Sequence, residues 1–449
     1  MSLRVALLAF ALAFLGSLTA PPARSQGAAP DSLGAFFKGL SDSTDASYGA
    51  QSIAIDTTGL DSLAANALMS PPRIKKGRGR LTLAPLLGYH RAESVIAGLT
   101  SRIGTPARGW LSMSGTYGFG NHEGRYAFGY RRTLVYHGLR RTRALADPGR
   151  ILDGATRLDA EIEYARSSLA FMPEHAGHRL WNIEPVLSGK GSASLYEQRG
   201  ATGSLTLWTG DWRFIAGARH AIEESMPVVT DWTLFNTSDA APPNTQARGD
   251  EYTEPFGSIG FRRGDWEFAG LIDARGGGAD RWRLRGVLAK SLRLGTSLKF
   301  NAQFEGGATA ANAPRQRRFE IGGDRAVPSL PLGTGGTDHL LLGKFEFVEA
   351  HDVLRAIGIG HPDWLVLQPM ATFQTGVVWD DPAQRDVVFS KPPSNAWRSS
   401  MGAGFAMRVG APEPDVLFRF YLGWPVGPEA GTPEVRASMS STFDLIGRL

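Results

Sequence analysis

The stretch GRLTLAPLLGYHRAESVIAGLTSRIGTPARGWLSMSGTYGFGNHEGRYAFGYRRTLVY, residues 79–136, decides the fold class. Within it, four runs alternate apolar and polar residues, and each run is followed by glycine or by charged residues. A period of two places successive side chains on opposite faces of a strand. Runs of about 9–11 residues match membrane-crossing strands, whose lipid-facing and lumen-facing side chains must alternate. The stretch therefore predicts the first strands of a transmembrane β-barrel in a bacterial outer membrane.

The same alternation continues toward the C-terminus. For residues 79–449 we predict an all-β fold, a transmembrane antiparallel β-barrel of 12–16 strands, because single-chain barrels of this kind have even strand numbers. A closed barrel pairs every backbone N–H and C=O where the membrane offers no water. The candidate strands are residues 80–90, 94–104, 109–119, 124–136, 156–167, 193–208, 211–221, 252–263, 265–275, 281–291, 296–305, 338–349, 364–379, 397–409, 414–424 and 433–444.

Four longer stretches separate these candidate strands. They are rich in Pro, Gly, Asn and Asp, which favour turns and loops. Outer-membrane barrels have short periplasmic turns and longer extracellular loops, so we expect most of them outside the cell. The four are residues 168–192, 222–250, 306–337 and 380–396.

The first 78 residues of the chain have a different pattern. Residues 1–25 have a charged start, an apolar core from Val5 to Ala20, and small residues Ala23 and Ser25 before Gln26, which predicts a signal peptide. Residues 26–78 show no period of two. We interpret them as a short periplasmic extension, partly disordered, that either docks beneath the barrel or plugs its lumen.

Composition excludes several classes of function. The chain has no cysteine, so disulfides, thiolate metal sites and cysteine nucleophiles are excluded. The formal net charge is +5, and the arginines are dispersed along the candidate strands, apart from a short cluster at residues 75–80. Nucleic-acid binding usually requires concentrated basic tracts. We therefore expect no nucleic-acid partner, and we predict no cofactor or metal.

Aromatic residues give two more predictions. In GRYAFGYRRTLV, the alternate residues Tyr126, Phe128 and Tyr130 have large aromatic side chains on one face of the strand. We expect this face to contact lipid. Many other aromatic residues fall near strand ends and are interpreted as interfacial girdles. Those near strand ends are Trp110, Tyr117, Phe119, Tyr126, Tyr130, Trp208, Trp212, Trp266, Trp282, Trp364, Trp379, Trp397 and Trp424.

No catalytic motif stands out. Glu174, His175 and His178 have near-ligand spacing but lie in a predicted loop and lack the HExxH order. The pairs His351-Asp352 and Asp380-Asp381 supply acids and imidazole at strand ends, where polar residues are common. An outer-membrane protease or phospholipase stays a third hypothesis, and we predict that the protein is not an enzyme.

Several segments resemble the outer-membrane barrels of the bacterial surface antigen family. GYHRAESVIAGL (88–99) resembles the signature at the start of those barrels, with Tyr89, Arg91 and Glu93 matching. His90, Ala92 and Ser94 stand where that signature has Asn, Val and Gly. Further resemblance lies in residues 116–134, 337–347, 418–427 and 435–444, which are similar to the second hairpin, a later strand and the closing strand pair.

RRFEIGGDRAVPSLP (317–331) resembles the lead into the loop that this family folds into the lumen. If Gly322 and Gly323 align with the family's glycines, Pro328, Ser329 and Leu330 occupy the positions of arginine, glycine and an aromatic residue. The resemblance implies that an arginine fastens the loop to an acidic patch on the wall, and Arg325 is the nearby candidate. We expect residues 306–337 to fold into the lumen, with Glu346 or Glu267 among the possible partners.

These observations predict an outer-membrane barrel with a channel, transport or assembly-related role, without the family's long periplasmic repeats. The alternative is a structural or surface-interaction barrel whose outer loops bind ligands. Expected partners are outer-membrane lipids and lipopolysaccharide, with a periplasmic or lipoprotein partner as a further possibility.

Overall fold

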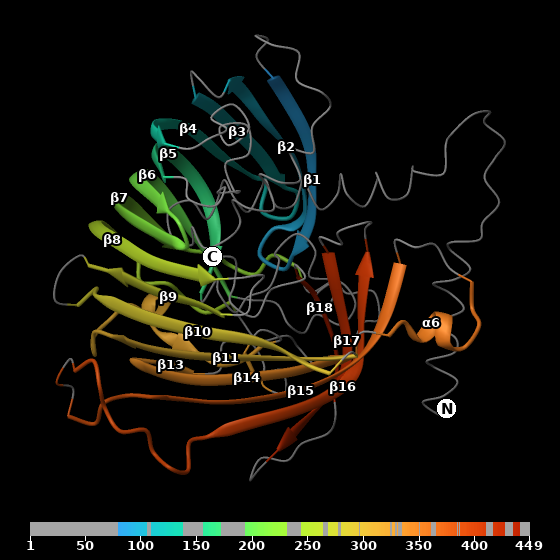
Figure 1. The fold of residues 1–449 in the computed structure, drawn as a ribbon. Coiled ribbons are helices and arrows are strands. Elements are labelled where there is room, and N and C mark those ends of the chain that lie inside the picture. The colour runs from blue at the N-terminus through green and yellow to red at the C-terminus, as the bar shows by residue number, and fades with distance from the viewer. Residues whose placement is uncertain are drawn as a thin grey trace, which may run out of the picture. The chain divides into compact units, whose positions relative to one another are not determined.

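Sixteen long strands form one continuous antiparallel sheet in the computed structural model (Figure 1). The predicted signal peptide and the segment 26–78 lie outside the residues that the structure describes. Those residues are 80–105, 109–137, 156–171, 194–230, 244–263, 268–276, 280–295, 297–323, 326–327, 330, 335–349, 351–360, 365–383, 385, 387–409, 416–426 and 434–440.

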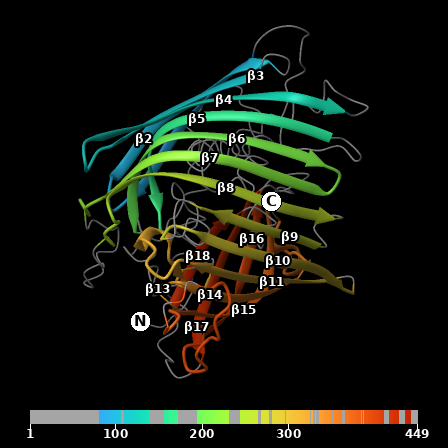
Figure 2. The ribbon, with the colours of Figure 1, turned by 90° about the vertical axis from the view of Figure 1, so that its left-hand side faces the viewer.

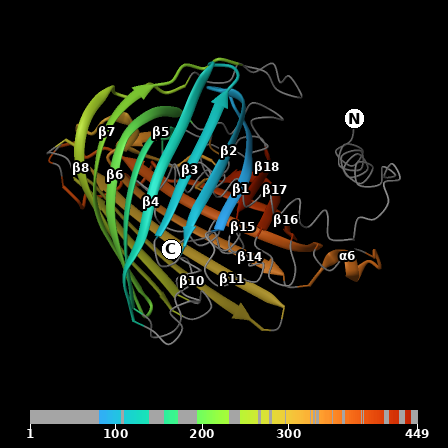
Figure 3. The ribbon, with the colours of Figure 1, turned by 90° about the horizontal axis from the view of Figure 1, so that it is seen from above.

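The strands follow one another around the sheet in chain order, and each predicted stretch overlaps one of them. Figure 3 shows the sheet curling from β1 through β8 and β11 back toward β18. In order, they are β1 (Arg80–His90), β2 (Ser94–Thr105), β3 (Gly109–Gly118), β4 (Glu123–His137), β5 (Thr156–Ala170), β6 (Leu195–Thr209), β7 (Trp212–Ser225), β8 (Asp250–Arg263), β9 (Phe268–Arg275), β10 (Arg283–Leu294), β11 (Leu298–Thr309), β14 (His339–Glu349), β15 (Leu365–Trp379), β16 (Arg398–Val409), β17 (Val416–Val426) and β18 (Glu434–Ser440).

The alternation in the sequence becomes an inner and an outer face. In β4, Phe128 is 50% exposed and Tyr130 is exposed, whereas Ala127 and Arg131, which flank them, are buried. The predicted outward parity of this strand is therefore confirmed. The same inversion holds elsewhere: large apolar side chains such as Ile162 are on the outside. An apolar exterior and a charged interior are the arrangement of a transmembrane barrel.

Arginine–carboxylate pairs between strands fill much of the inner face. Arg131 contacts Asp159 at 3.0 Å, and Arg285 contacts Glu305 at 2.8 Å. Arg419 on β17 donates to Glu346 on β14 at 2.8 Å. Glu346 thus lies in the inward parity, as predicted, although its partner is Arg419. Such pairs satisfy the charged groups inside the sheet while keeping its interior polar.

Two tryptophans depart from the predicted girdles. Trp212 and Trp397 are exposed, but Trp208 and Trp379 are buried. Trp208 faces the interior, where the guanidinium of Arg213 lies 4.8 Å from its ring centroid. Stacking against arginine accounts for an interior tryptophan in a charged surrounding.

The connections differ between the two ends of the sheet. At one end most connections are short, as at residues 210–211, where Gly210 has a positive φ of 54°. The connections 138–155 and 350–364 at this end are longer. At the other end lie the long connections 171–194, 226–249, 310–338 and 380–397. Figure 2 shows β3 to β11 running across the wall between these ends. We call them the short-turn end and the long-loop end.

Four short elements complete the described chain, and none was predicted. They are the 3-10 helix η1 (Arg315–Arg317), the strands β12 (Phe319–Glu320) and β13 (Gly335–Thr337), and the helix α6 (Val353–Ala356). The strands β12 and β13 pair with each other as a separate small sheet.

No helix among the described residues has both the length and the apolar composition needed to cross a membrane.

Candidate functional site: a segment anchored inside the barrel

The connection between β11 and β14, residues 310–338, folds against the inner face of the sheet. We call it the lumen segment. Its described side chains contact β7 and β8 on one side and β14 and β15 on another. These two groups of strands are separated along the sheet by β9, β10 and β11. The lumen segment is thus fastened to two separate parts of the wall.

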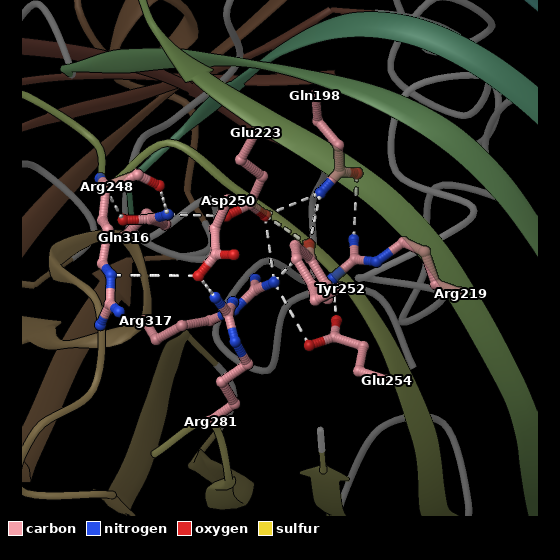
Figure 4. Close-up of polar contacts among 10 residues, drawn as sticks. All are labelled: Gln198, Arg219, Glu223, Arg248, Asp250, Tyr252, Glu254, Arg281, Gln316 and Arg317. Carbon is pink, nitrogen blue, oxygen red and sulfur yellow. Dashed lines mark hydrogen bonds and ion pairs between the residues drawn. The ribbon is translucent and has the colours of Figure 1, made fainter. Parts of the chain in front are cut away.

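The first fastening is a polar anchor centred on Arg317 of η1. Its guanidinium Nη2 lies 3.0 Å from Glu223 Oε1 and 3.2 Å from Glu254 Oε2. The same nitrogen donates to the Tyr252 hydroxyl at 2.5 Å. Arg317 and both carboxylates are at most 1% exposed. Figure 4 shows the Arg317 side chain directed between these three wall residues.

The strand geometry explains why these wall residues converge. Tyr252 and Glu254 are two residues apart on β8 and therefore share its inner face. Arg219 and Glu223, four residues apart on β7, share the inner face of the neighbouring strand. Arg219 contacts the carboxylate of Glu254 and donates to Gln198 Oε1 on β6 at 3.1 Å. The acceptors for Arg317 are therefore fixed by three adjacent strands.

Glu223 is the most connected group of this anchor. Its Oε1 accepts hydrogen bonds from Gln198 Nε2 at 3.0 Å and from the Tyr252 hydroxyl at 2.5 Å. Its Oε2 accepts from Gln316 Nε2 of the lumen segment at 2.7 Å. Gln316 also bonds the backbone of Arg248, donating to its carbonyl and accepting from its N–H. Two consecutive residues of η1 thus hold one wall carboxylate.

Electrostatics keep this anchor charged. Burial alone would lower the pKa of Arg317, but the carboxylates of Glu223 and Glu254 raise that pKa well above its usual value. Arg281, beside β10, also stacks on the Tyr252 ring at 4.7 Å. Its pKa is lowered, chiefly by burial and then by the positive charge of Arg317. The anchor is an ion pair network and not a set of neutral groups.

The second fastening is apolar and begins two residues later. Phe319, Ile321, Ala326 and Val327 of the lumen segment form a buried cluster with Leu340 and Leu342 of β14, against which Val378 of β15 packs. The guanidinium of Arg283 lies 4.7 Å from the Phe319 ring centroid. The ring also covers Gly307 of β11, where a Cβ would lie 2.4 Å from a ring carbon. The glycine makes room for the aromatic ring.

A small hairpin shapes the middle of the lumen segment. Gly335 and Gly336 of β13 have φ of 110° and 94°, which glycine adopts readily. Arg315 crosses Gly336, donates to the Gly335 carbonyl at 2.6 Å and contacts Glu320 at 2.8 Å. Burial raises the pKa of Glu320 to about 7, although Arg315 acts in the opposite direction. The hairpin therefore contains a carboxyl group that titrates near neutral pH.

The predicted glycines lie in this segment. Gly322 forms an isolated bridge with Val327, and Gly323 has a positive φ of 96° and donates to the Leu330 carbonyl at 3.0 Å. Arg325 lies outside the described residues, as do Pro328 and Ser329. The candidate partner Glu267 also lies outside them. Arg317, which was not predicted, makes the contacts to the acidic wall.

The predicted motif at the start of the barrel lies in and beside the turn from β1 to β2. Tyr89, Arg91 and Glu93 are buried. The carbonyl of Arg91 accepts from the N–H groups of Val229 and Thr230, in the connection after β7. Glu93 accepts a 3.0 Å hydrogen bond from Ser168 of β5 and lies 3.8 Å from Arg125 of β4. The turn therefore packs against later strands at the long-loop end.

The first turn and the lumen segment both pack near the long-loop end of β7. Ala92 packs with Ala170, Leu195 and Met226, at the ends of β5, β6 and β7. The lumen segment begins its contacts at Glu223 on β7 and extends to β15.

Among the described residues, no group of His, Cys, Asp and Glu is arranged to hold a metal ion. The side chains of the predicted constellation Glu174, His175 and His178 lie outside the described residues. His351 contacts Glu349 at 2.6 Å on the exposed surface, and the Asp352 side chain caps α6 through the Leu354 N–H. Both have structural contacts at the short-turn end.

Comparisons with known proteins found similarity to solved structures. No protein-family model matches the chain, and a search of curated proteins found no match. BamA from Haemophilus ducreyi lacking POTRA domains 1–3 has a TM-score of 0.48 and 10% identity, over 81% of this chain and 71% of that one. CdiB from Acinetobacter baumannii has a TM-score of 0.39 and 12% identity, over 80% of this chain and 59% of that one. The outer membrane protein OpdK from Pseudomonas aeruginosa has a TM-score of 0.33 and 10% identity, over 81% of this chain and 98% of that one.

Proposed function

We propose that this chain is an outer-membrane channel whose lumen is closed by the lumen segment. Sixteen strands enclose an aqueous channel when nothing else fills the barrel, because diameter grows with strand number. The observation that carries the proposal is the pair of anchors on separate parts of the wall: Arg317 on β7 and β8, and Phe319 on β14. A segment held at both places lies across the interior.

The chemistry of the interior supports passage of polar solutes. Besides ion pairs, the inner face near β11, β14 and β15 carries amide and hydroxyl groups. Asn301 donates to Glu346 at 3.1 Å and accepts from Ser291 at 2.7 Å. Gln303, Thr372 and Gln374 are buried on the same strands. A wall of this composition hydrogen-bonds water and polar solutes and gives apolar molecules little to contact.

Liposome swelling in an iso-osmotic sugar solution tests the proposal. We would compare the full chain with a variant in which Ala311–Thr337 is replaced by a short Gly-Ser linker that joins β11 to β14. The full chain is expected to swell liposomes slowly and the shortened variant rapidly. A shortened variant that is folded, shown by different migration before and after boiling, and yet admits no solute would contradict the channel proposal. It would favour the structural alternative.

A further inference from the structure

The outer face of the sheet carries a covered patch at the long-loop end of β14 and β15. Leu340 and Leu342 of β14 face the buried cluster inside, so His339 and Leu341 have the outward parity. His339 is paired in register with Trp379 of β15, and their rings stack at 5.1 Å between centroids. Both side chains are nevertheless buried. Something outside the sheet covers them.

The connection from β15 to β16, residues 380–397, provides this cover. Nε2 of His339 lies 2.9 Å from the carbonyl oxygen of Val387, and Nδ1 lies 2.6 Å from Asp338 Oδ1. The Asp338 carboxylate accepts from the Asp381 N–H at 3.0 and 3.1 Å. Asp381 in turn accepts from the Arg385 N–H at 3.0 Å. The connection is fastened to the outer face by defined hydrogen bonds.

This fastened connection presents apolar side chains to the outside. Phe389 is 92% exposed, and the neighbouring Val388 is also exposed. Lys391, two residues further, is exposed, and the Arg385 side chain is 66% exposed. At this exposure the Phe389 ring makes little contact with the described part of the chain. Arg385 is paired with Asp381 at 3.5 Å. Apolar side chains followed by a cation, here Lys391, are typical of segments that lie in a membrane interface.

The patch lies on the same face of the sheet as the apolar exterior of the barrel. Phe373 of β15 is paired in register with Met401 of β16, and both are exposed on the outer face. Leu341 of β14 is exposed on the same face. The connection leaves the sheet six residues beyond Phe373, at the end of β15 opposite α6 (Figure 1). Its apolar tip therefore extends the surface that contacts lipid.

We propose that residues 387–391 form a docking surface for the outer leaflet of the membrane, with Val388 and Phe389 inserted among acyl chains and Lys391 beside lipid phosphates. The proposal rests on the proposed function, an outer-membrane channel, and takes the long-loop end as the outer one because the longer loops of such barrels are extracellular. The occupant is the phosphorylated glycolipid of that leaflet. Cationic and apolar groups in one short segment match its phosphates and acyl chains together.

Spin labelling tests this directly, since the chain has no native cysteine. Phe389→Cys carries the label of interest. Ile162→Cys, on the outer face of β5, is the lipid reference, and Gln246→Cys, exposed in the connection before β8, is the aqueous reference. Each labelled protein is placed in vesicles of phosphatidylcholine with lipid A. Collisions with oxygen and with a water-soluble nickel chelate are then measured.

The label at position 389 is expected to resemble the lipid reference, with high oxygen and several-fold lower nickel accessibility than the aqueous reference. Lys391→Glu should raise its nickel accessibility, and His339→Ala should do so by releasing the connection. A label as accessible to nickel as the aqueous reference, while position 162 stays lipid-like, overturns the proposal and leaves the membrane barrel intact. Protection in cells but not in vesicles would indicate a protein partner and would also overturn it.

Discussion

Arg317 of the lumen segment and Glu223 of β7 lie 3.0 Å apart, and neither side chain is more than 1% exposed. They are 94 residues apart in sequence. The contact fastens a connection between β11 and β14 to the wall near β7. A buried charge pair of this kind contributes little net stability when complete, but removing one partner is costly. Its chief consequence is to specify where the segment lies.

Removing that arginine should destabilise the barrel. Arg317→Ala leaves the carboxylates of Glu223 and Glu254 with one cation fewer, so we expect a loss of about 3–5 kcal/mol in the free energy of unfolding. Chemical denaturation in detergent measures it. Arg293→Ala, an exposed arginine of β10, is the matched control and should be near neutral.

The pairing itself is tested by adding Glu223→Gln. If Arg317 and Glu223 act together, the double variant loses less than the sum of the two single variants. Strictly additive losses would mean that the two side chains do not interact in the folded protein.

A single methyl group should displace the apolar anchor. Gly307→Ala places a Cβ 2.4 Å from the Phe319 ring, so the ring must move and we expect a cost of about 1–3 kcal/mol. Gly203→Ala in β6 is the matched control, since a Cβ there meets nothing within 4 Å. Equal thermal midpoints for both variants would contradict the packing of Phe319 on Gly307.

The stability of the folded protein should depend on pH through Glu320. Its pKa is about 7 in the folded state, above the ordinary glutamate value, so folding favours the protonated group. The stabilisation of the folded state by the protonated group is complete below pH of about 4.5. It is lost as pH rises through about 7, and the free energy of unfolding then falls by roughly 2–3 kcal/mol. Denaturation midpoints at pH 5 and pH 8 measure it. Glu320→Gln should remove most of the difference, and an unchanged difference would assign it to other groups.

A charge on the lipid-facing surface should be costly. Phe128 of β4 is half exposed on the outer face, so Phe128→Arg should lose about 2–4 kcal/mol if the position lies near the bilayer midplane. The free energy of unfolding in lipid vesicles measures it, with Phe128→Leu as the control. Similar values for the two variants would mean that this face does not meet lipid.

The sequence predicts the wall well because local chemistry dictates it. Alternation in GRYAFGYRR is enough to assign Phe128 to the outside and Arg131 to the inside, whatever lies beyond neighbouring strands. Strand positions follow from the same pattern and from turn residues such as Gly210. Girdle predictions failed at Trp208, where a nearby Arg213 gives an interior tryptophan a partner.

The site is harder to predict because it depends on contacts between distant residues. Arg317 is the first residue of the segment 317–331, which resembles the family's lumen loop. Nothing in the neighbouring sequence distinguishes it from Arg318 or Arg325. The sequence of β8 did indicate part of the site, because Tyr252 and Glu254 share the inward parity. Choosing Glu223 as the partner of Arg317 would still require the position of η1 inside the barrel.

Single-channel recording in planar bilayers tests the central claim most directly. We would compare the full chain with Arg317→Ala/Phe319→Ala, which weakens both anchors, and with Arg293→Ala. The full chain and Arg293→Ala should be closed most of the time, whereas the double variant should show frequent and long openings. A double variant that is folded and inserted, yet as silent as the full chain, would contradict closure of the lumen by this segment.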